Sequence, residues 1–239
     1  MIKYHGTPFS PVHLFEQHMK GKNILIPFSR RDTLKRALKS GANIIFDNGA
    51  YTLWKQGKKV DWDKYYDWVK KHYERITYFI IPDVIDGTEL ENNNLIKNYY
   101  SQDFDNQTKA VPVWHVAESF ERLQKLMNSF DYVAFGSSGE FQVLGTSKWH
   151  SRMHEVMKFV CDETGTPKIK IHMLRCLKNE IFTKYPFYSG DSVTVARNHK
   201  DYGEGGVVKL LNNIEPFNSP NKYKYMGLNR SPFSRNLFD

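Results

Sequence analysis

Short apolar runs alternate along the chain with longer segments in which apolar residues recur at helical spacing. The runs are rich in β-branched and aromatic residues and are sharply bounded, which is typical of buried parallel strands. The sequence predicts eight such strands, over residues 2–4, 23–28, 43–47, 76–81, 110–114, 132–135, 169–174 and 187–189.

The segments between these strands are predicted to be helical. The clearest covers residues 61–74, where Trp62, Tyr65 and Val69 share one helix face and Asp61 is the predicted N-cap. The other predicted helices cover residues 11–20, 31–39, 89–100, 118–128, 147–164 and 177–184.

Eight strands separated by helices fit a closed parallel barrel, because parallel strands need crossover connections that are usually helical. We therefore predict an α/β fold, with a single (β/α)8 TIM-type barrel over residues 1–212. An irregular C-terminal extension over residues 213–239 is expected to pack on the barrel or to contact a partner. An open doubly wound sheet is the alternative. Its glycine-rich phosphate loop would normally follow the first strand, where this chain has His5-Gly6-Thr7-Pro8.

Composition indicates a folded protein outside the membrane. The chain has 239 residues, of which 40% are hydrophobic and 15% aromatic, enough for a sizeable core. It contains no run of about 18 apolar residues, so no transmembrane helix is predicted. The N-terminus also lacks the apolar stretch of a signal peptide. Cys161 and Cys176 have no CxxC spacing, which argues against a disulfide framework or a zinc knuckle and favours the reducing cytoplasm.

The chain is basic, with a formal charge of +8 at pH 7 from 34 Lys and Arg against 26 Asp and Glu. A nucleic-acid partner would explain this balance, because each phosphate neutralised by a basic side chain releases condensed counterions. Soluble basic proteins that bind no nucleic acid have the same balance, so charge alone leaves both interpretations open.

Candidate chemistry is concentrated just after the predicted strands. In a TIM barrel the loops after the carboxyl ends of the strands carry the active site. The residues at these positions are His5, Ser29, Asp47, Asp83, His115, Gly136, Arg175 and Asp191. Three carboxylates at one face are costly to desolvate, which points to a function for the set. The alternative is that each Asp caps a helix or shapes a turn.

These residues stand in five short motifs. In chain order the motifs are Phe46-Asp47-Asn48-Gly49-Ala50-Tyr51, Pro82-Asp83-Val84-Ile85-Asp86-Gly87, Gly136-Ser137-Ser138-Gly139-Glu140, His172-Met173-Leu174 and Ser189-Gly190-Asp191-Ser192. Their order resembles the tRNA-guanine transglycosylase superfamily, and within it the compact phage DNA-guanine transglycosylases called DpdA. The resemblance extends from about His5 to Arg197.

The resemblance implies a role for each motif. Asp191, after the last strand, would be the nucleophile, and Asp47 the general acid and base. Asp83, with Asp86 as the alternative, would bind the guanine edge. Further contacts to the base would come from Gly136, Ser137, Met173 and His115.

The chain departs from the tRNA enzymes in two respects. It lacks their zinc site of three clustered cysteines and a histidine, so no cofactor is expected. His150 and His154, with Cys161 further along, are either an alternative metal site or one solvated face of a helix. Trp114 or His115 stands where the tRNA enzymes have a glutamine, which puts base selectivity in doubt.

The implied chemistry is consistent with these residue types. The Watson–Crick edge of guanine offers two donors, N1–H and the exocyclic amine, which one carboxylate accepts together. Cleavage of the N-glycosidic bond develops positive charge at C1′, which a second carboxylate traps covalently, as in retaining glycosidases. The expected function is exchange of guanine in DNA for a 7-deazaguanine base, the small-molecule co-substrate. The target base has to be flipped out of the duplex.

Three alternatives remain open at the level of sequence. They are the same reaction on tRNA, an unrelated carboxylate-dependent TIM-barrel hydrolase, and a non-catalytic DNA-binding module. If the partner is nucleic acid, the candidates for phosphate contacts are Arg30, Arg31, Arg175 and Arg197. The alternative for these arginines is a solvated surface.

Overall fold

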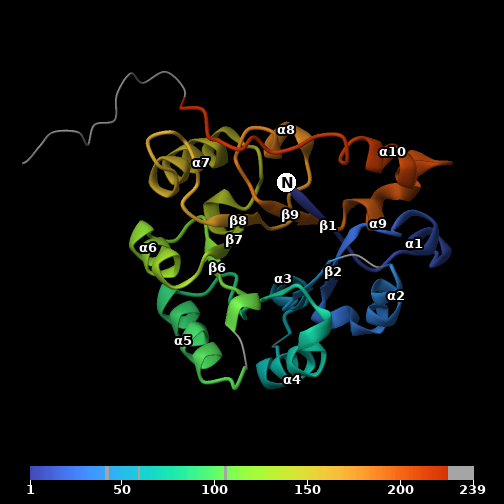
Figure 1. Cartoon of the computed structure of the whole chain (residues 1–239), viewed down its shortest axis with the longest axis horizontal. Helices are drawn as coiled ribbons and strands as arrows, with labels where there is room; N and C mark the ends of the chain where they lie inside the picture. The colour runs from blue at the N-terminus through green and yellow to red at the C-terminus, as the bar shows by residue number, and fades with distance from the viewer. Residues whose placement is uncertain (41–42, 59, 105–106, 226–239) are drawn as a thin grey trace, which may run out of the picture.

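The described residues form a barrel of parallel strands surrounded by helices (Figure 1). The computed structural model describes residues 1–40, 43–58, 60–104 and 107–225. Within them nine strands form one nearly closed sheet in the order β5-β4-β3-β2-β1-β9-β8-β7-β6. The predicted α/β class is confirmed, and the nearly closed parallel sheet is consistent with a TIM-type barrel rather than an open doubly wound sheet.

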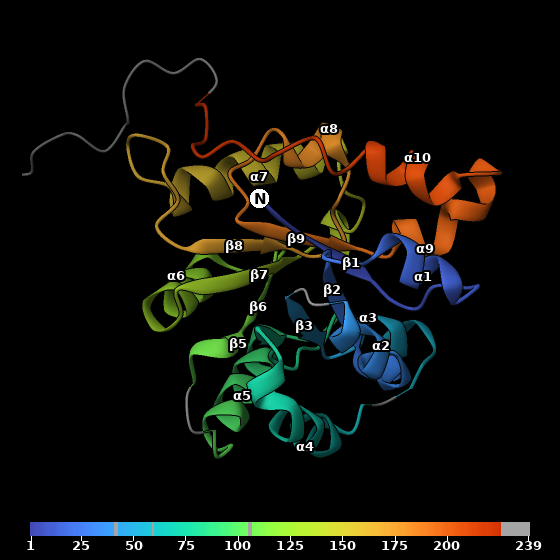
Figure 2. The same ribbon diagram turned by 45° about the vertical axis from the view of Figure 1, so that its right-hand side comes forward.

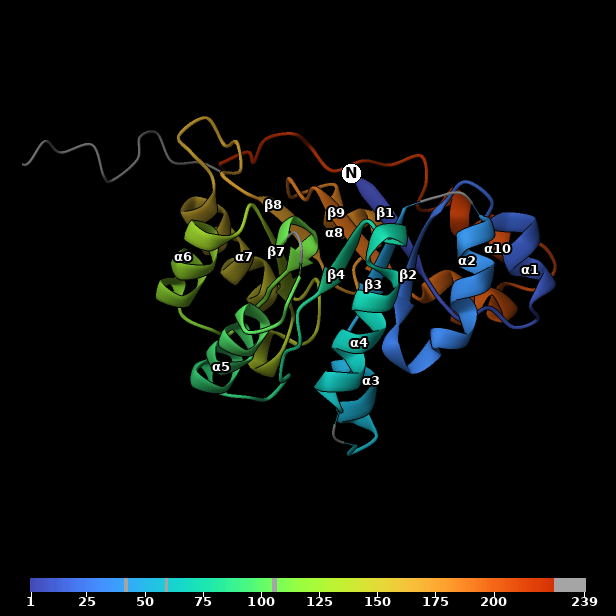
Figure 3. The ribbon, with the colours of Figure 1, turned by 60° about the horizontal axis from the view of Figure 1, so that its bottom comes forward.

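Each predicted strand has a counterpart close to its predicted position. The strands are β1 Ile2–Gly6, β2 Asn23–Pro27, β3 Ile44–Asp47, β4 Tyr78–Ile80, β5 Ala110–Val111, β6 Val113–His115, β7 Tyr132–Gly136, β8 Lys170–Met173 and β9 Ser189–Ser192. Strands β1 to β4 lie side by side, with α5, α6 and α7 on one flank and α1, α2 and α10 on the other (Figure 3).

The helices cover the outside of the barrel. They are α1 His13–His18, α2 Leu34–Lys39, α3 Ala50–Lys55, α4 Trp62–His72, α5 Glu89–Tyr100, α6 Phe120–Ser129, α7 Ser147–Val160, α8 Asn179–Phe182, α9 Thr194–Asn198 and α10 Gly206–Asn212. Asp61 caps α4 as predicted, since its Oδ1 accepts a hydrogen bond from Lys64 N at 3.1 Å. The short helices α3, α9 and α10 were not predicted, because their few turns give little periodicity.

The predicted strand over residues 110–114 is divided at Pro112. Strand β5 pairs with β4, whereas β6, one residue further on, pairs with β7. Proline has no N–H and cannot donate to a ladder. Its carbonyl still accepts a hydrogen bond from Ala134 N at 2.8 Å. Residues 110–115 therefore pair with β4 on one side of Pro112 and with β7 on the other, which brings the two edges of the sheet together.

The last strand lies later than predicted. The apolar run at residues 187–189 predicts a strand there, but the ladder to β1 and β8 is formed by Ser189–Ser192. All four residues of this strand are buried although their side chains are polar or absent. As a result Asp191 lies within β9 and not in the loop after it.

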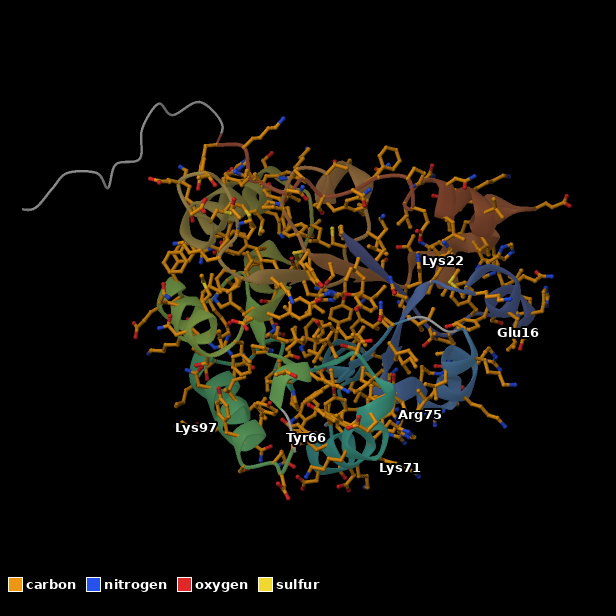
Figure 4. The ribbon with its side chains drawn as sticks, in the orientation of Figure 1. Glu16, Lys22, Tyr66, Lys71, Arg75 and Lys97 are labelled. Atoms are coloured by element: carbon orange, nitrogen blue, oxygen red, sulfur yellow. The ribbon has the colours of Figure 1, made fainter. Side chains whose placement is uncertain are left out.

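Side chains fill the barrel and the space between barrel and helices. The interior layer consists of Tyr4, Leu25, Ile45, Ile80, Val111, Val113, Tyr132 and Ala134. Two larger clusters pack the sheet against the helices. In Figure 4 the labelled charged residues Lys71 and Lys97 lie at the periphery, around a centre densely filled with side chains. No helix of the described residues is long and apolar enough to cross a bilayer.

The described part of the C-terminal extension packs on the barrel. After α10 the chain runs back along α8 and α7 (Figure 2). Tyr223 N donates to Gly165 O at 2.7 Å. Closer to α10, Glu215 Oε1 lies 2.6 Å from His5 Nε2, so the His5 ring faces the extension on the outside of the barrel. Residues 226–239 of the predicted extension lie outside the described residues.

Candidate functional site

Three carboxylates come together at the carboxyl ends of the strands. Asp47 ends β3, Asp83 follows β4, and Asp191 lies in β9. Burial raises the pKa of Asp47 to about 7, and the negative charges of Asp191 and then Asp83 contribute to the shift. Such an effect requires the three groups to lie within electrostatic reach of one another.

Asp47 is the most accessible of the three. Its side chain is partly exposed, and its Oδ2 accepts a hydrogen bond from Gly49 N at 3.2 Å. Gly49 has φ +79°, a left-handed conformation that glycine adopts without strain, and it directs its N–H back to the carboxylate. This hydrogen bond and the charge of Arg175 only partly offset the upward shift of the Asp47 pKa. The group therefore exchanges a proton near neutral pH.

Asp191 is held through one oxygen. Its Oδ1 accepts hydrogen bonds from Arg175 N at 2.9 Å and from His172 Nε2 at 3.2 Å. In the part of the chain that the structure describes, no residue donates to Oδ2. Arg175 has φ +59°, which is uncommon for a residue with a side chain and is often found at functional sites. Hydrogen bonds thus hold Oδ1 of Asp191 in place, while Oδ2 has no donor among the described residues.

The side chain of Arg175 links three loops of the site. Its Nη2 donates to Ser137 O at 2.6 Å, and its Cζ lies 3.9 Å from the centroid of the Tyr51 ring. Tyr51 belongs to α3, directly after the Asp47 motif. The predicted phosphate contact of Arg175 would have to compete with these interactions, each of which is favourable for a guanidinium.

Asp83 is nearly enclosed, with 6% of its surface exposed. Its Oδ1 accepts a hydrogen bond from Asn48 Nδ2 at 2.7 Å, and its Oδ2 lies 2.9 Å from His115 Nε2. Asn48 is itself fixed, because its Oδ1 accepts from Ala50 N at 2.8 Å. A carboxylate has about four lone-pair sites, so each oxygen of Asp83 keeps one for a further donor.

His115 is a buried cation between two carboxylates. Burial opposes its charge, but the hydrogen bonds and charges of Asp83 and Glu118 outweigh burial and raise the pKa of His115 to about 9. Glu118 Oε2 accepts in turn from Arg122 Nη1 at 2.6 Å and from His115 N at 2.8 Å. The imidazolium therefore holds Asp83 and is itself anchored to the start of α6.

The predicted base loop after β7 lies against these groups. A Cβ on Gly136 would come within 2.8 Å of His115 Cδ2, so only glycine leaves room for the ring. Ser137 is buried, and its Oγ accepts from Trp149 Nε1 on α7 at 2.9 Å. The backbone carbonyl of Ser137 is the partner of Arg175.

Met173 does not lie at the site, contrary to the expectation from the sequence. It is fully buried in the cluster between the sheet and the helices. Successive strand residues point to opposite faces, so His172 and Leu174 are the ones that face the interior. Leu174 is partly exposed and packs on the interior layer, which makes it the apolar residue nearest to the predicted role.

Several other predicted residues lie away from the three carboxylates. Asp86 is in an exposed turn, which leaves Asp83 as the carboxylate at this position. Arg30 pairs with Asp32 at 3.1 Å, and the Cζ of Arg31 lies 4.2 Å from the centroid of the Phe28 ring. Arg197 is exposed on α9.

Sequence reasoning missed His172, Asn48 and Glu118 as members of the site. His172 and Asn48 stand inside the motifs that drew attention to the carboxylates. Strand alternation was the available signal for His172, because it places residue 172 and not 173 on the face of Asp191. For Glu118, which acts through His115, no local signal exists.

The alternative metal site is not assembled. His150 Nδ1 lies 2.6 Å from Tyr185 Oη, and His154 Nδ1 contacts Tyr223 Oη. Both rings pack on tyrosines, while Cys161 is buried. Among residues 1–40, 43–58, 60–104 and 107–225, no group of three or more His, Cys, Asp or Glu side chains is arranged to hold a metal ion.

Comparison with known proteins does not assign the chain to a family. It has no significant match among protein-family models, curated proteins or solved structures. The geometry of the site is therefore the basis for a functional proposal.

Proposed function

We propose that this protein is a DNA-guanine transglycosylase that exchanges guanine in DNA for a 7-deazaguanine base. The observation that carries the proposal is the grouping of three carboxylates in three different environments. Asp191 has hydrogen-bond donors on one carboxylate oxygen and, among the described residues, none on the other. The pKa of Asp47 is raised to about 7. Asp83 is buried and contacts the imidazole ring of His115. Carboxylates with divergent environments are the pattern of a nucleophile paired with a general acid and base.

The first half of the reaction uses Asp191 and Asp47. An oxygen of Asp191 forms a bond to C1′ of the target nucleotide while the C1′–N9 bond breaks and its electron pair stays on guanine. Asp47 gives its proton to the departing base, which leaves as neutral guanine. The product is an aspartyl ester of the DNA sugar. A pKa of about 7 suits Asp47 to this step, since efficient proton transfer needs a pKa near the working pH.

The second half restores both carboxylates. The incoming 7-deazaguanine gives its N9 proton to the Asp47 carboxylate, and N9 forms a bond to C1′ as the bond to Asp191 breaks. No proton is gained or lost over the cycle. The enzyme needs no cofactor for this sequence of steps.

Asp83 is the proposed recognition group for the base. Its free lone pairs can accept from N1–H and the exocyclic amine of guanine, whereas adenine offers an acceptor at N1. The contact with His115 Nε2 orients Asp83 for this purpose. Leu174 and the Tyr51 ring would pack on the flat faces of the base.

We also propose that the fold is a (β/α)8 barrel. If β5 and β6 count as one strand interrupted at Pro112, the barrel has eight strands and the (β/α)8 topology. The phosphate backbone would then lie across the loops after the strands, near Arg30, Arg31 and Arg197. We further propose that the enzyme works in a reducing cytoplasm, which suits its buried free cysteines.

Incubation with duplex DNA and candidate 7-deazaguanines, followed by mass spectrometry of the nucleosides, tests the proposal. Wild type should incorporate the base, and Asp191→Ala should lose incorporation and the covalent adduct with DNA. Asp67→Ala, at an exposed position on α4, is the matched control and should keep full activity. Incorporation by Asp191→Ala, or incorporation into tRNA but not DNA, would refute the proposal in this form.

A further inference from the structure

A line of polar side chains runs from Asp191 into the interior of the barrel. His172 Nε2 lies 3.2 Å from Asp191 Oδ1, and His172 Nδ1 lies 2.5 Å from Ser189 Oγ. Ser189 Oγ is also 2.5 Å from Tyr132 Oη. His172 and Ser189 are completely buried. The three side chains come from the adjacent strands β7, β8 and β9, so the sheet itself fixes their spacing.

The number of available protons determines which group donates and which accepts in each hydrogen bond of this line. An ionised Asp191 only accepts, so Nε2 of His172 carries the proton and Nδ1 is a bare acceptor. The single hydrogen of Ser189 then points to Nδ1, and the hydrogen of Tyr132 points to Ser189. Burial raises the pKa of Tyr132 well above its ordinary value, so the phenol keeps that hydrogen. Every group in the line is satisfied.

The opposite direction leaves groups unsatisfied. If Nδ1 carried the proton, bare Nε2 would face the carboxylate of Asp191, two acceptors against each other. Ser189 would then donate to Tyr132. The hydroxyl hydrogen of Tyr132 would be left without an acceptor among the described residues. Unpaired polar groups in a buried site are costly, because they lose their hydrogen bonds to water without replacement, so this arrangement is disfavoured.

We propose that the buried line Tyr132–Ser189–His172 positions the nucleophile, with His172 locked as the neutral Nε2–H tautomer so that Asp191 reacts through Oδ2. The inference rests on the proposed role of Asp191 as nucleophile. Arg175 N and His172 Nε2 both bind Oδ1, which leaves Oδ2 without a hydrogen-bond donor among the described residues. His172 is a positioning residue, because it touches Asp191 and not the substrate.

The same two donors assist the second half of the reaction. Once Oδ2 is bonded to C1′, Oδ1 is the carbonyl oxygen of the ester. When the Oδ2–C1′ bond breaks, the electron pair returns to the carboxylate, and charge develops on Oδ1 where two N–H groups are already in place. Preorganised donors of this kind lower the barrier without any rearrangement.

The tautomer can be measured without any substrate. In a spectrum of ¹⁵N-histidine-labelled protein at pH 8, the His172 ring should carry a proton on Nε2 and none on Nδ1. The His172→Gln variant identifies the signal by its loss. In Ser189→Ala, Asp191 still accepts from Nε2, so the ring should keep the Nε2–H form, and the Nδ1 signal should shift because that nitrogen has lost its hydrogen bond. A wild-type ring that carries a proton on Nδ1 at pH 8 would overturn the proposal.

Single-turnover kinetics test the positioning role. His172→Phe removes the donor, and formation of the covalent adduct should slow by about 10²-fold with little change in KM for DNA. His172→Gln has an amide N–H that can replace Nε2–H and an oxygen that can accept from Ser189, so it should recover most of the rate. Full activity of a folded His172→Phe variant, or a His172→Gln variant as slow as His172→Phe, would contradict the role.

The two experiments separate the proposals. If wild type exchanges no base in DNA, the proposed function fails, while the tautomer spectrum still decides whether the buried line is organised as described. If wild type is active and the Nε2–H tautomer is absent, only the positioning proposal fails. Should His172→Phe not fold, His172→Gln and Ser189→Ala decide the question.

Discussion

Nε2 of His115 lies 2.9 Å from Oδ2 of Asp83, and both side chains are almost completely buried. The two residues belong to opposite sides of the division at Pro112, one after β4 and the other at the end of β6. A buried pair of this kind stabilises the fold only while both groups are charged, because one unpaired charge in the interior is costly.

The first prediction follows from the raised pKa of His115. A raised histidine pKa gives stability that is fully present below its ordinary value of 6.5 and is lost as the pH rises through about 9. The free energy of unfolding should therefore fall between these values, by on the order of 2 kcal/mol. Denaturant titrations at pH 6 and pH 9.5 measure the fall. His115→Gln should reduce the fall to the smaller part that ionisation of Asp47 contributes, and His13→Gln, at an exposed position, should keep it as in wild type.

The second prediction concerns Asp47. Its raised pKa means that stability is present below the ordinary value of 3.8 and is lost as the pH rises through about 7. Asp47→Asn should accordingly be more stable than wild type at pH 8, by on the order of 1–3 kcal/mol, with no gain near pH 4. The same variant should lose base exchange by about 10²- to 10⁴-fold. A variant that is less stable than wild type at pH 8 would contradict the assignment of the shifted pKa.

The third prediction uses the close approach of Gly136 to His115. An alanine Cβ would lie 2.8 Å from the ring carbon Cδ2, so the ring has to move and its contact with Asp83 weakens. Gly136→Ala should lower the free energy of unfolding by about 1–3 kcal/mol. In the double variant with His115→Ala the clash is gone, so the two changes should cost less together than the sum of their separate effects. Strict additivity in denaturant titrations would show that the steric account is wrong.

Much of the fold was predictable because local rules and tertiary packing agree. Helix α5 spans the predicted residues 89–100, and Thr88 and Glu91 form a capping box that fixes its start. Strand β9 was misplaced because its stability comes from partners in other strands. Ser189 forms hydrogen bonds with Tyr132 and His172, and these contacts cannot be predicted from the pattern of hydrophobic residues along the chain.

The candidate site was predictable only in part, for a related reason. A carboxylate after a strand is visible in the sequence, and Asp47 and Asp83 were found in this way. The groups that give each carboxylate its properties are set by strand register and by distant loops. A shift of one residue decides between Met173 and His172, and the anchoring of His115 by Glu118 depends on how α6 packs.

The fourth prediction tests the attachment of the C-terminal extension. Glu215 lies 2.6 Å from His5 and 3.5 Å from Lys22 Nζ, and the hydrogen bond with His5 lowers the pKa of Glu215 to about 2. Glu215→Gln should cost about 1 kcal/mol at pH 7, a modest value because the carboxylate is about one third exposed. A lowered pKa gives stability that is lost as the pH falls from 4.5 through about 2, so the difference from wild type should vanish there. Glu16→Gln, in an exposed pair at 3.9 Å, is the control and should have little effect at pH 7.

The division of the sheet at Pro112 determines where binding of a ligand at Asp83 would affect the backbone. Strands β4 and β6 meet where one backbone ladder stops and another starts, and the contact of Asp83 with His115 crosses that junction. If a purine binds Asp83 as proposed, it competes with His115 for this carboxylate and changes the contact across the junction. Backbone amides beside Pro112 should then exchange with deuterium at different rates in the free and purine-bound protein, so exchange in the barrel backbone would report whether Asp83 is occupied.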